Sequence, residues 1–90
     1  MEFMLTLRPF EQKDIGRTCP FMPDEYDAEI YLTALSNDLQ ERDWCKKIIR
    51  NNFSISIDTN IEDIVDIKRE ISPILSNYVC YLRFSKISPL

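Results

Sequence analysis

One stretch decides the fold: TNIEDIVDIKREI, residues 59–71. Its apolar residues recur at helical spacing and fall mostly on one face; they are Ile61, Ile64, Val65, Ile67 and Ile71. Thr59 or Asn60 offers the oxygen that accepts a hydrogen bond at a helix N-terminus. Glu62 and Asp63 suit the positive end of the helix dipole. We therefore predict a helix over this stretch.

Alternating segments lie on both sides of this helix. Phe53–Asp58 precedes it and Tyr78–Ser85 follows it, and a third alternating segment, Glu2–Arg8, begins the chain. Alternation of apolar and polar residues predicts strands with one buried face. Strands buried on both faces would instead show continuous apolar runs. We expect the helices to cover one face of a sheet and to leave the other face open.

The region from Pro23 to Asn51 predicts two helices. Acidic residues after Pro23 suit a first turn, and one apolar stripe follows: Ala28, Tyr31, Leu32, Leu35 and Leu39. A second apolar set does not continue this stripe: Trp44, Cys45, Ile48 and Ile49. A single helix would also be about 40 Å long, so we expect a break between Ser36 and Asp43. The alternative, a strand over Ile30–Ala34, conflicts with the acidic first turn.

The remaining elements complete a small domain over residues 1–90. Pro73 is expected to interrupt the helix after residue 71 and to start a short piece, Ile74–Asn77. Lys86–Leu90 is expected to be a loose tail. The predicted order is β-α-α-β-α-β, an α+β or small α/β fold with a three-stranded sheet and helices on one face.

Phe10–Met22 is predicted to be a loop, because it contains the only glycine and shows no periodicity. It leads into an apolar segment, Cys19-Pro20-Phe21-Met22-Pro23. This segment either closes one end of the core or lies on the surface as an anchor for a partner, since aromatic and Met side chains are enriched in interfaces.

Composition limits the function classes. The net charge is −4, which argues against a general nucleic-acid-binding protein. Three bases near Trp44 are interpreted as a solvated face; they are Lys46, Lys47 and Arg50. We expect no signal peptide and no membrane span. The three cysteines, Cys19, Cys45 and Cys80, form no C-x-x-C pair, so we predict reduced thiols in a cytoplasmic protein.

No residue pattern predicts catalysis. The chain has no histidine, which removes the commonest general base and metal ligand. Its single glycine excludes the usual phosphate-binding loops. Three carboxylates at helical spacing, Glu62, Asp63 and Asp66, fit a solvated helix face better than a cation site. We predict neither an enzyme nor a cofactor nor a metal site.

Carboxylates and aromatic residues are interleaved between residues 24 and 44. Aromatic anchors within a rim of one charge sign are typical of a surface that captures a basic partner. The alternative is that the aromatic residues are core and the carboxylates keep the domain soluble. The candidate partner-binding residues are Asp24, Glu25, Tyr26, Asp27, Tyr31, Asp38, Glu41, Asp43 and Trp44.

In size and composition the chain resembles bacterial immunity proteins and antitoxins, although no motif carries this resemblance. The resemblance implies an inhibitor that covers the basic active site of a nuclease-type toxin. The alternative is a structural or regulatory module that homodimerises or docks as a subunit through its open sheet face. The residues expected on that face are Met4, Thr6, Ser54, Ser56, Val79 and Tyr81.

Overall fold

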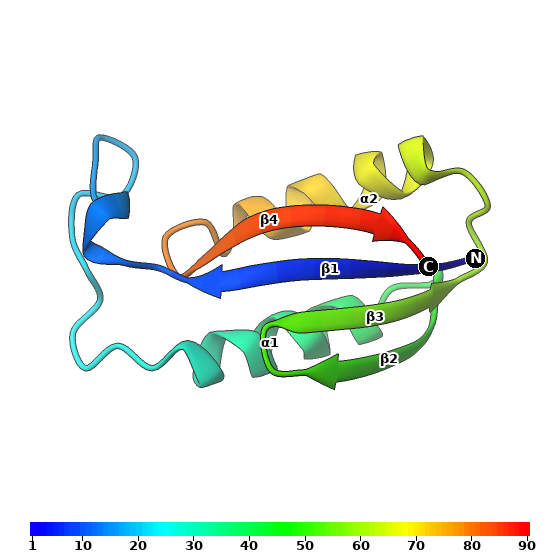
Figure 1. Ribbon diagram of the computed structural model, residues 1–90, viewed down its shortest axis with the longest axis horizontal. Coiled ribbons are helices and arrows are strands. Elements are labelled where there is room, and N and C mark those ends of the chain that lie inside the picture. Colours follow the sequence, from blue (N-terminus) through cyan, green and yellow to red (C-terminus); the bar gives the residue numbers. More distant parts are fainter.

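The computed structural model describes all residues from 1 to 90. The fold consists of four strands and two helices (Figure 1). In chain order they are β1 (Glu2–Pro9), α1 (Ala28–Gln40), β2 (Cys45–Asn51), β3 (Ser54–Thr59), α2 (Ile64–Ser76) and β4 (Leu82–Pro89). A short 3-10 helix, η1 (Gln12–Asp14), follows β1. Of the two predicted classes, α+β or small α/β, the structure shows α+β. The sheet has four strands, so the predicted three-stranded sheet is wrong in that detail.

The strands lie in the order β2-β3-β1-β4, and every neighbouring pair is antiparallel. Because β3 runs antiparallel to both β1 and β2, the two strands joined by α1 run in the same direction with β3 between them. The element order β-α-β-β-α-β is that of the ferredoxin-like, or split βαβ, arrangement. Each helix therefore connects strands that are not neighbours in the sheet.

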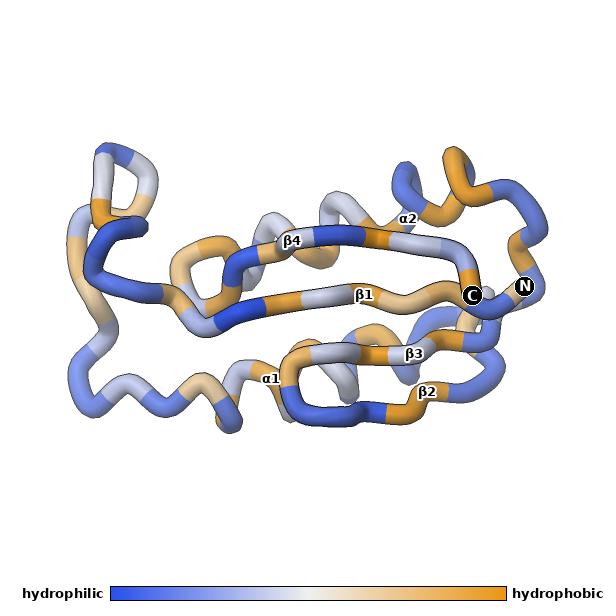
Figure 2. Tube along the Cα trace, viewed as in Figure 1, coloured by the Kyte–Doolittle hydropathy of each residue, from blue (hydrophilic) through white to orange (hydrophobic).

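Both helices lie against the same face of the sheet, as predicted (Figure 1). The buried cluster between the layers contains residues of the sheet and of both helices. The sheet contributes Phe3, Leu5 and Leu7 from β1 and Ile55 and Ile57 from β3, and α1 and α2 contribute leucines and isoleucines. Hydrophobic and hydrophilic residues alternate along β3 (Figure 2). The opposite face of the sheet has no helix on it.

The fourth strand, β2, occupies the region where a second helix was expected. Ile48 pairs with Ile57 and faces the core, whereas the next residue, Ile49, lies on the open face and is exposed. Asn52 then turns the chain into β3 with a positive φ of 55°, a conformation that asparagine tolerates. β-branched residues beside an asparagine turn favour a hairpin, and this signal outweighs the helical spacing.

Helix α1 confirms the predicted stripe and the predicted break. Leu32, Leu35 and Leu39 are buried, and the helix ends at Gln40. Its start is later than Pro23: the carboxylate of Asp27 caps it by accepting a hydrogen bond of 3.0 Å from the amide of Glu29. Residues 23–27 lead into the helix through a turn at Asp24 and Glu25, where Glu25 has a positive φ of 48°.

Helix α2 begins later than expected. Asp63, rather than Thr59 or Asn60, caps it by accepting from the amide of Val65 at 2.9 Å. Thr59 is instead the buried last residue of β3, where its hydroxyl donates to the carbonyl of Trp44 at 2.6 Å. The pairing of β3 with its neighbours therefore extends to the residue that seemed suited to capping.

The expected interruption at Pro73 is wrong, because α2 continues through it to Ser76. Ile71, Ile74 and Leu75 on both sides of the proline are buried in the core. The hydroxyl of Ser72 donates to the carbonyl of Lys68 at 2.6 Å. Packing of the apolar face therefore holds the helix despite the backbone hydrogen bond that proline cannot donate.

The last strand is also shifted along the chain. Residues 77–81 form a turn in which the amide of Leu82 donates to the carbonyl of Tyr78 at 2.7 Å. Val79 and Tyr81 therefore do not lie on the open sheet face. The expected loose tail is wrong, because Lys86 to Pro89 pair with β1 and the amide of Leu90 donates to Glu2 at 3.0 Å. Neither helix has the length or the apolar character that crossing a membrane requires.

Candidate protein-interaction site

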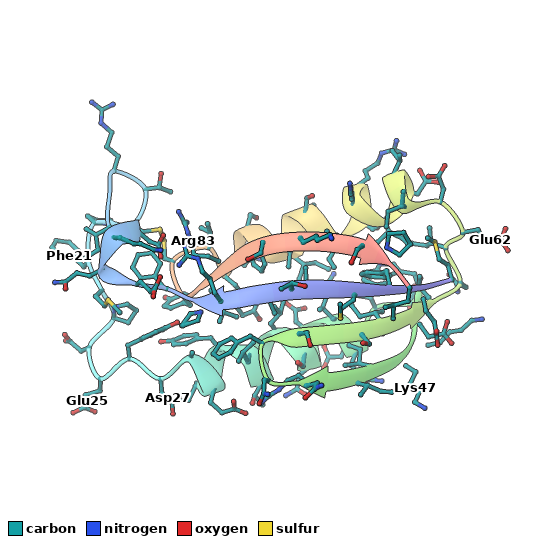
Figure 3. The ribbon with its side chains drawn as sticks, viewed as in Figure 1. Phe21, Glu25, Asp27, Lys47, Glu62 and Arg83 are labelled. Carbon is teal, nitrogen blue, oxygen red and sulfur yellow. A yellow bond between two sulfur atoms is a disulfide. The ribbon has the colours of Figure 1, made fainter.

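The candidate residues fall into two groups at opposite ends of α1. Asp24, Glu25, Tyr26, Asp27 and Tyr31 lie before or within its first turn, and Asp38, Glu41, Asp43 and Trp44 lie at or after its last turn. A helix of 13 residues is about 20 Å long. Residues 24–44 therefore do not form one compact acidic surface. Glu62, one of the three carboxylates near the start of α2, lies at the other end of the molecule from Glu25 and Asp27 (Figure 3).

The first group lies at one end of the sheet, in the long loop between β1 and α1 and in the first turn of α1 (Figure 1). Phe21 is 80% exposed and Met22 is also exposed, so this segment does not plug the core. Phe21, Glu25 and Asp27 all project at this end (Figure 3). We call the exposed residues Phe21, Met22, Asp24, Glu25 and Asp27 the loop-end surface.

A disulfide between Cys19 and Cys80 fastens the loop to the turn at residues 77–81. The predicted reduced thiols at these two positions are therefore wrong. The two cysteines are 61 residues apart in sequence, and their Cα atoms are 5.5 Å apart in the fold. Cys45 is free and partly buried, and burial raises the pKa of its thiol. The odd cysteine count gave no means of choosing this pair.

Three tyrosine rings, next to the loop-end surface in sequence or in the fold, form a stack. The ring centroids of Tyr31 and Tyr81 are 4.1 Å apart, and those of Tyr26 and Tyr31 are 5.8 Å apart. The hydroxyl of Tyr26 donates to the carbonyl of Tyr81 and accepts from the amide of Phe10 at 2.9 Å. Burial raises the pKa of Tyr26. The stack thus joins the loop, α1 and the 77–81 turn, and its rings are only partly exposed.

An ion cluster fixes the other side of the loop. Arg8 and Arg83 lie opposite each other on β1 and β4, where two like charges repel. Asp14 of η1 bridges them: its carboxylate accepts two hydrogen bonds from Arg8 at 2.7 Å and lies 3.5 Å from Arg83. Hydrogen bonding to Arg8 holds the pKa of Asp14 well below its usual range. Sequence reasoning missed this cluster, because nothing local pairs residue 14 with residue 83.

Two of the four residues in the second group, Asp38 and Trp44, already contact the rest of the chain. Asp38 accepts from Arg42 at 2.8 Å and from the hydroxyl of Tyr78 at 3.4 Å. Trp44 is partly buried and packs against the core. Glu41 and Asp43 are exposed. The far end of α1 therefore offers two exposed carboxylates but no exposed aromatic side chain.

An open cavity of about 420 Å³ lies between the loop and two rings of the stack, those of Tyr31 and Tyr81. Residues 18–24 line one side, and Tyr31, Cys80 and Tyr81 line the other. Six of the ten lining residues are hydrophobic, and the one carboxylate among them is Asp24. The volume falls within the range of about 300–1,000 Å³ that is usual for ligand-binding pockets. The loop-end surface therefore combines an exposed aromatic residue, a concavity and unpaired carboxylates.

Comparisons with protein-family models, with curated proteins and with solved structures found no match to this chain. No group of three or more Asp, Glu or Cys side chains is arranged to hold a metal ion.

Proposed function

We propose that the protein is a binding protein that captures a basic protein partner through its loop-end surface. The observation that carries this proposal is the 80% exposure of Phe21, on a loop that a disulfide and an ion cluster hold in place. An aromatic side chain has few rotatable bonds, so it loses little conformational entropy on binding and suits the centre of an interface. The surrounding carboxylates give the partner its expected charge.

Charge complementarity supports the basic partner. Asp24 and Glu25 are exposed and form no ion pair with the chain. One carboxylate oxygen of Asp27 accepts the capping hydrogen bond of α1, and the side chain remains exposed. Carboxylates around an apolar centre accelerate association with a basic surface and select against acidic ones.

Within this class we favour an inhibitor of the immunity-protein or antitoxin type, acting on a nuclease-type toxin by covering its basic active site. Phe21 and Met22 would fill apolar contacts, and the three carboxylates would pair with basic residues that otherwise bind phosphate. The net charge of −4 is consistent with such a partner. The proposed activity is binding and requires no cofactor and no catalytic step.

The disulfide bears on the location of the protein. Disulfides persist in oxidising compartments and are rare in the cytosol. The Cys19–Cys80 disulfide therefore favours an oxidising compartment over the cytoplasmic location expected from the sequence.

Affinity capture tests the proposal. The tagged protein is incubated with an extract of the source cell, and bound proteins are eluted with salt and identified by mass spectrometry. We expect one basic protein in a near-equal molar ratio, lost with the variant F21S/D24K and retained with the matched charge reversal D43K at the far end of α1. Equal capture by F21S/D24K and the wild type would contradict the proposal.

The open sheet face supports a second candidate, a module that homodimerises or docks as a subunit. One row across this face consists of Ile49, Ser56, Met4 and Ser88, and Ile49 is 55% exposed. A cavity of about 230 Å³ lies at one end of the row and includes Ile49 and Leu90. Light scattering over a dilution series tests this candidate: a dimer that the variant I49K dissociates would favour it over the loop-end proposal.

A further inference from the structure

The loop-end cavity has walls of two kinds. Pro20, Phe21 and Met22 contribute apolar surface from the loop, and Tyr31 and Tyr81 contribute aromatic rings from α1 and the 77–81 turn. The Cys19–Cys80 disulfide joins the two walls, since both cysteines line the cavity. The cavity therefore lies between two chain segments that a covalent bond links.

One charged group faces this apolar space. Asp24 lines the cavity and forms neither an ion pair nor a hydrogen bond with the rest of the chain. No base of the chain pairs with Asp24: Arg8 and Arg83 pair with Asp14, and Arg50 pairs with Glu29. Arg17 forms no ion pair and lines an adjoining cavity, which shares Thr18 and Cys19 with this one. The charge of Asp24 therefore remains available to a ligand.

We propose that this cavity receives an arginine side chain of the basic partner, a step that rests on the proposed function and names its central contact. The methylene stem of arginine suits the apolar wall. Its planar guanidinium packs on aromatic rings and forms paired hydrogen bonds with a carboxylate. Tyr81 and Asp24 supply these two partners within one cavity.

Arginine fits this combination better than the other side chains of a partner. A lysine ammonium is compact, strongly hydrated and cannot stack on a ring. A purely apolar side chain would fill the walls but leave the carboxylate of Asp24 without a partner. The cavity therefore discriminates by its aromatic wall as well as by its charge.

A titration followed by amide chemical shifts tests the proposal without the partner. The probes are N-acetyl-arginine-N-methylamide, the corresponding lysine compound and the corresponding norleucine compound. We expect saturable shifts at Asp24, Tyr31 and Tyr81 with the arginine probe, with a Kd on the order of 10 mM. The lysine and norleucine probes should bind at least ~fivefold more weakly.

Variants locate the contact. D24N should weaken arginine binding about fivefold and Y81L should remove the preference for arginine over lysine. D43N, at the far end of α1, should change neither. Shifts that do not saturate, equal binding of norleucine, or unchanged arginine binding by D24N would overturn the proposal. If the arginine titration fails while F21S/D24K still abolishes partner capture, only this inference fails; the reverse result removes the proposed function.

Discussion

The carboxylate of Asp14 accepts two hydrogen bonds of 2.7 Å from the guanidinium of Arg8, a bidentate pair. Arg83, directly across the sheet from Arg8, approaches the same carboxylate. One side chain in η1 thus neutralises two arginines on neighbouring strands and fixes the start of the loop that carries Phe21. The cluster lies at the base of the proposed interface, and only its carboxylate, that of Asp14, is buried.

The cluster predicts a dependence of stability on acid pH. The pKa of Asp14 is lower in the folded state than its ordinary value of about 3.9. Its contribution to the free energy of unfolding is therefore fully present above about pH 4 and is lost as the pH falls further, toward the folded pKa. Urea unfolding of the wild type between neutral pH and about pH 2 should show this loss, and D14N should show a smaller one.

A matched variant separates Asp14 from the other carboxylates. D43N changes an exposed side chain without an ion pair and should leave the acid dependence of the wild type in place. If D14N lost as much stability on acidification as the wild type, the cluster would not be the source of the effect.

The disulfide predicts the number of reactive thiols. Without a reductant, a thiol-reactive dye should find one cysteine in the denatured protein, Cys45, and after reduction it should find three. A disulfide of this separation typically stabilises a protein by about 2–4 kcal/mol. The double variant C19S/C80S should therefore unfold at lower temperature, whereas C45S should change this temperature less. Three reactive thiols in the denatured protein without a reductant would rule the disulfide out.

Pro73 predicts a substitution that stabilises the protein. It lies exposed inside α2, where proline costs about 3 kcal/mol relative to alanine. Proline also restricts the unfolded chain, which offsets about 0.4–1 kcal/mol. P73A should therefore raise the free energy of unfolding by about 2 kcal/mol, measured by urea unfolding. E70A, exposed on the same helix, should stay within about 0.5 kcal/mol; a loss of stability in P73A would contradict this account of the helix.

The features that sequence reasoning recovered are those with local causes. The stripe of Leu32, Leu35 and Leu39 follows from helical periodicity, and the buried residues of β1 and β3 follow from alternation. The open face followed in turn from the polar residues between them. Each of these patterns lies within a single helix or strand, so the sequence of that one segment is enough to predict which residues are buried.

The errors have causes that are not local. Ile48 and Ile49 look alike in sequence, and only pairing with β3 decides that one faces the core and the other the open face. Pro73 stays within α2 because buried neighbours outweigh its intrinsic cost. For the candidate site, the exposed Phe21 was one of two interpretations, but the contributions of Tyr81 and Cys80 required the turn at residues 77–81 to be placed beside the loop.

The two phenylalanines of the loop predict opposite consequences of the same substitution. Phe10 is 1% exposed and Phe21 is 80% exposed. F10A should lower the free energy of unfolding by about 3–5 kcal/mol, since it removes a buried ring, whereas F21A should change it by no more than about 0.5 kcal/mol. Thermal unfolding of both variants measures this contrast. A large exposed ring that contributes nothing to folding is consistent with a role in binding. If F21A destabilised the protein as much as F10A, Phe21 would belong to the core, and the loop-end surface would have no exposed aromatic residue.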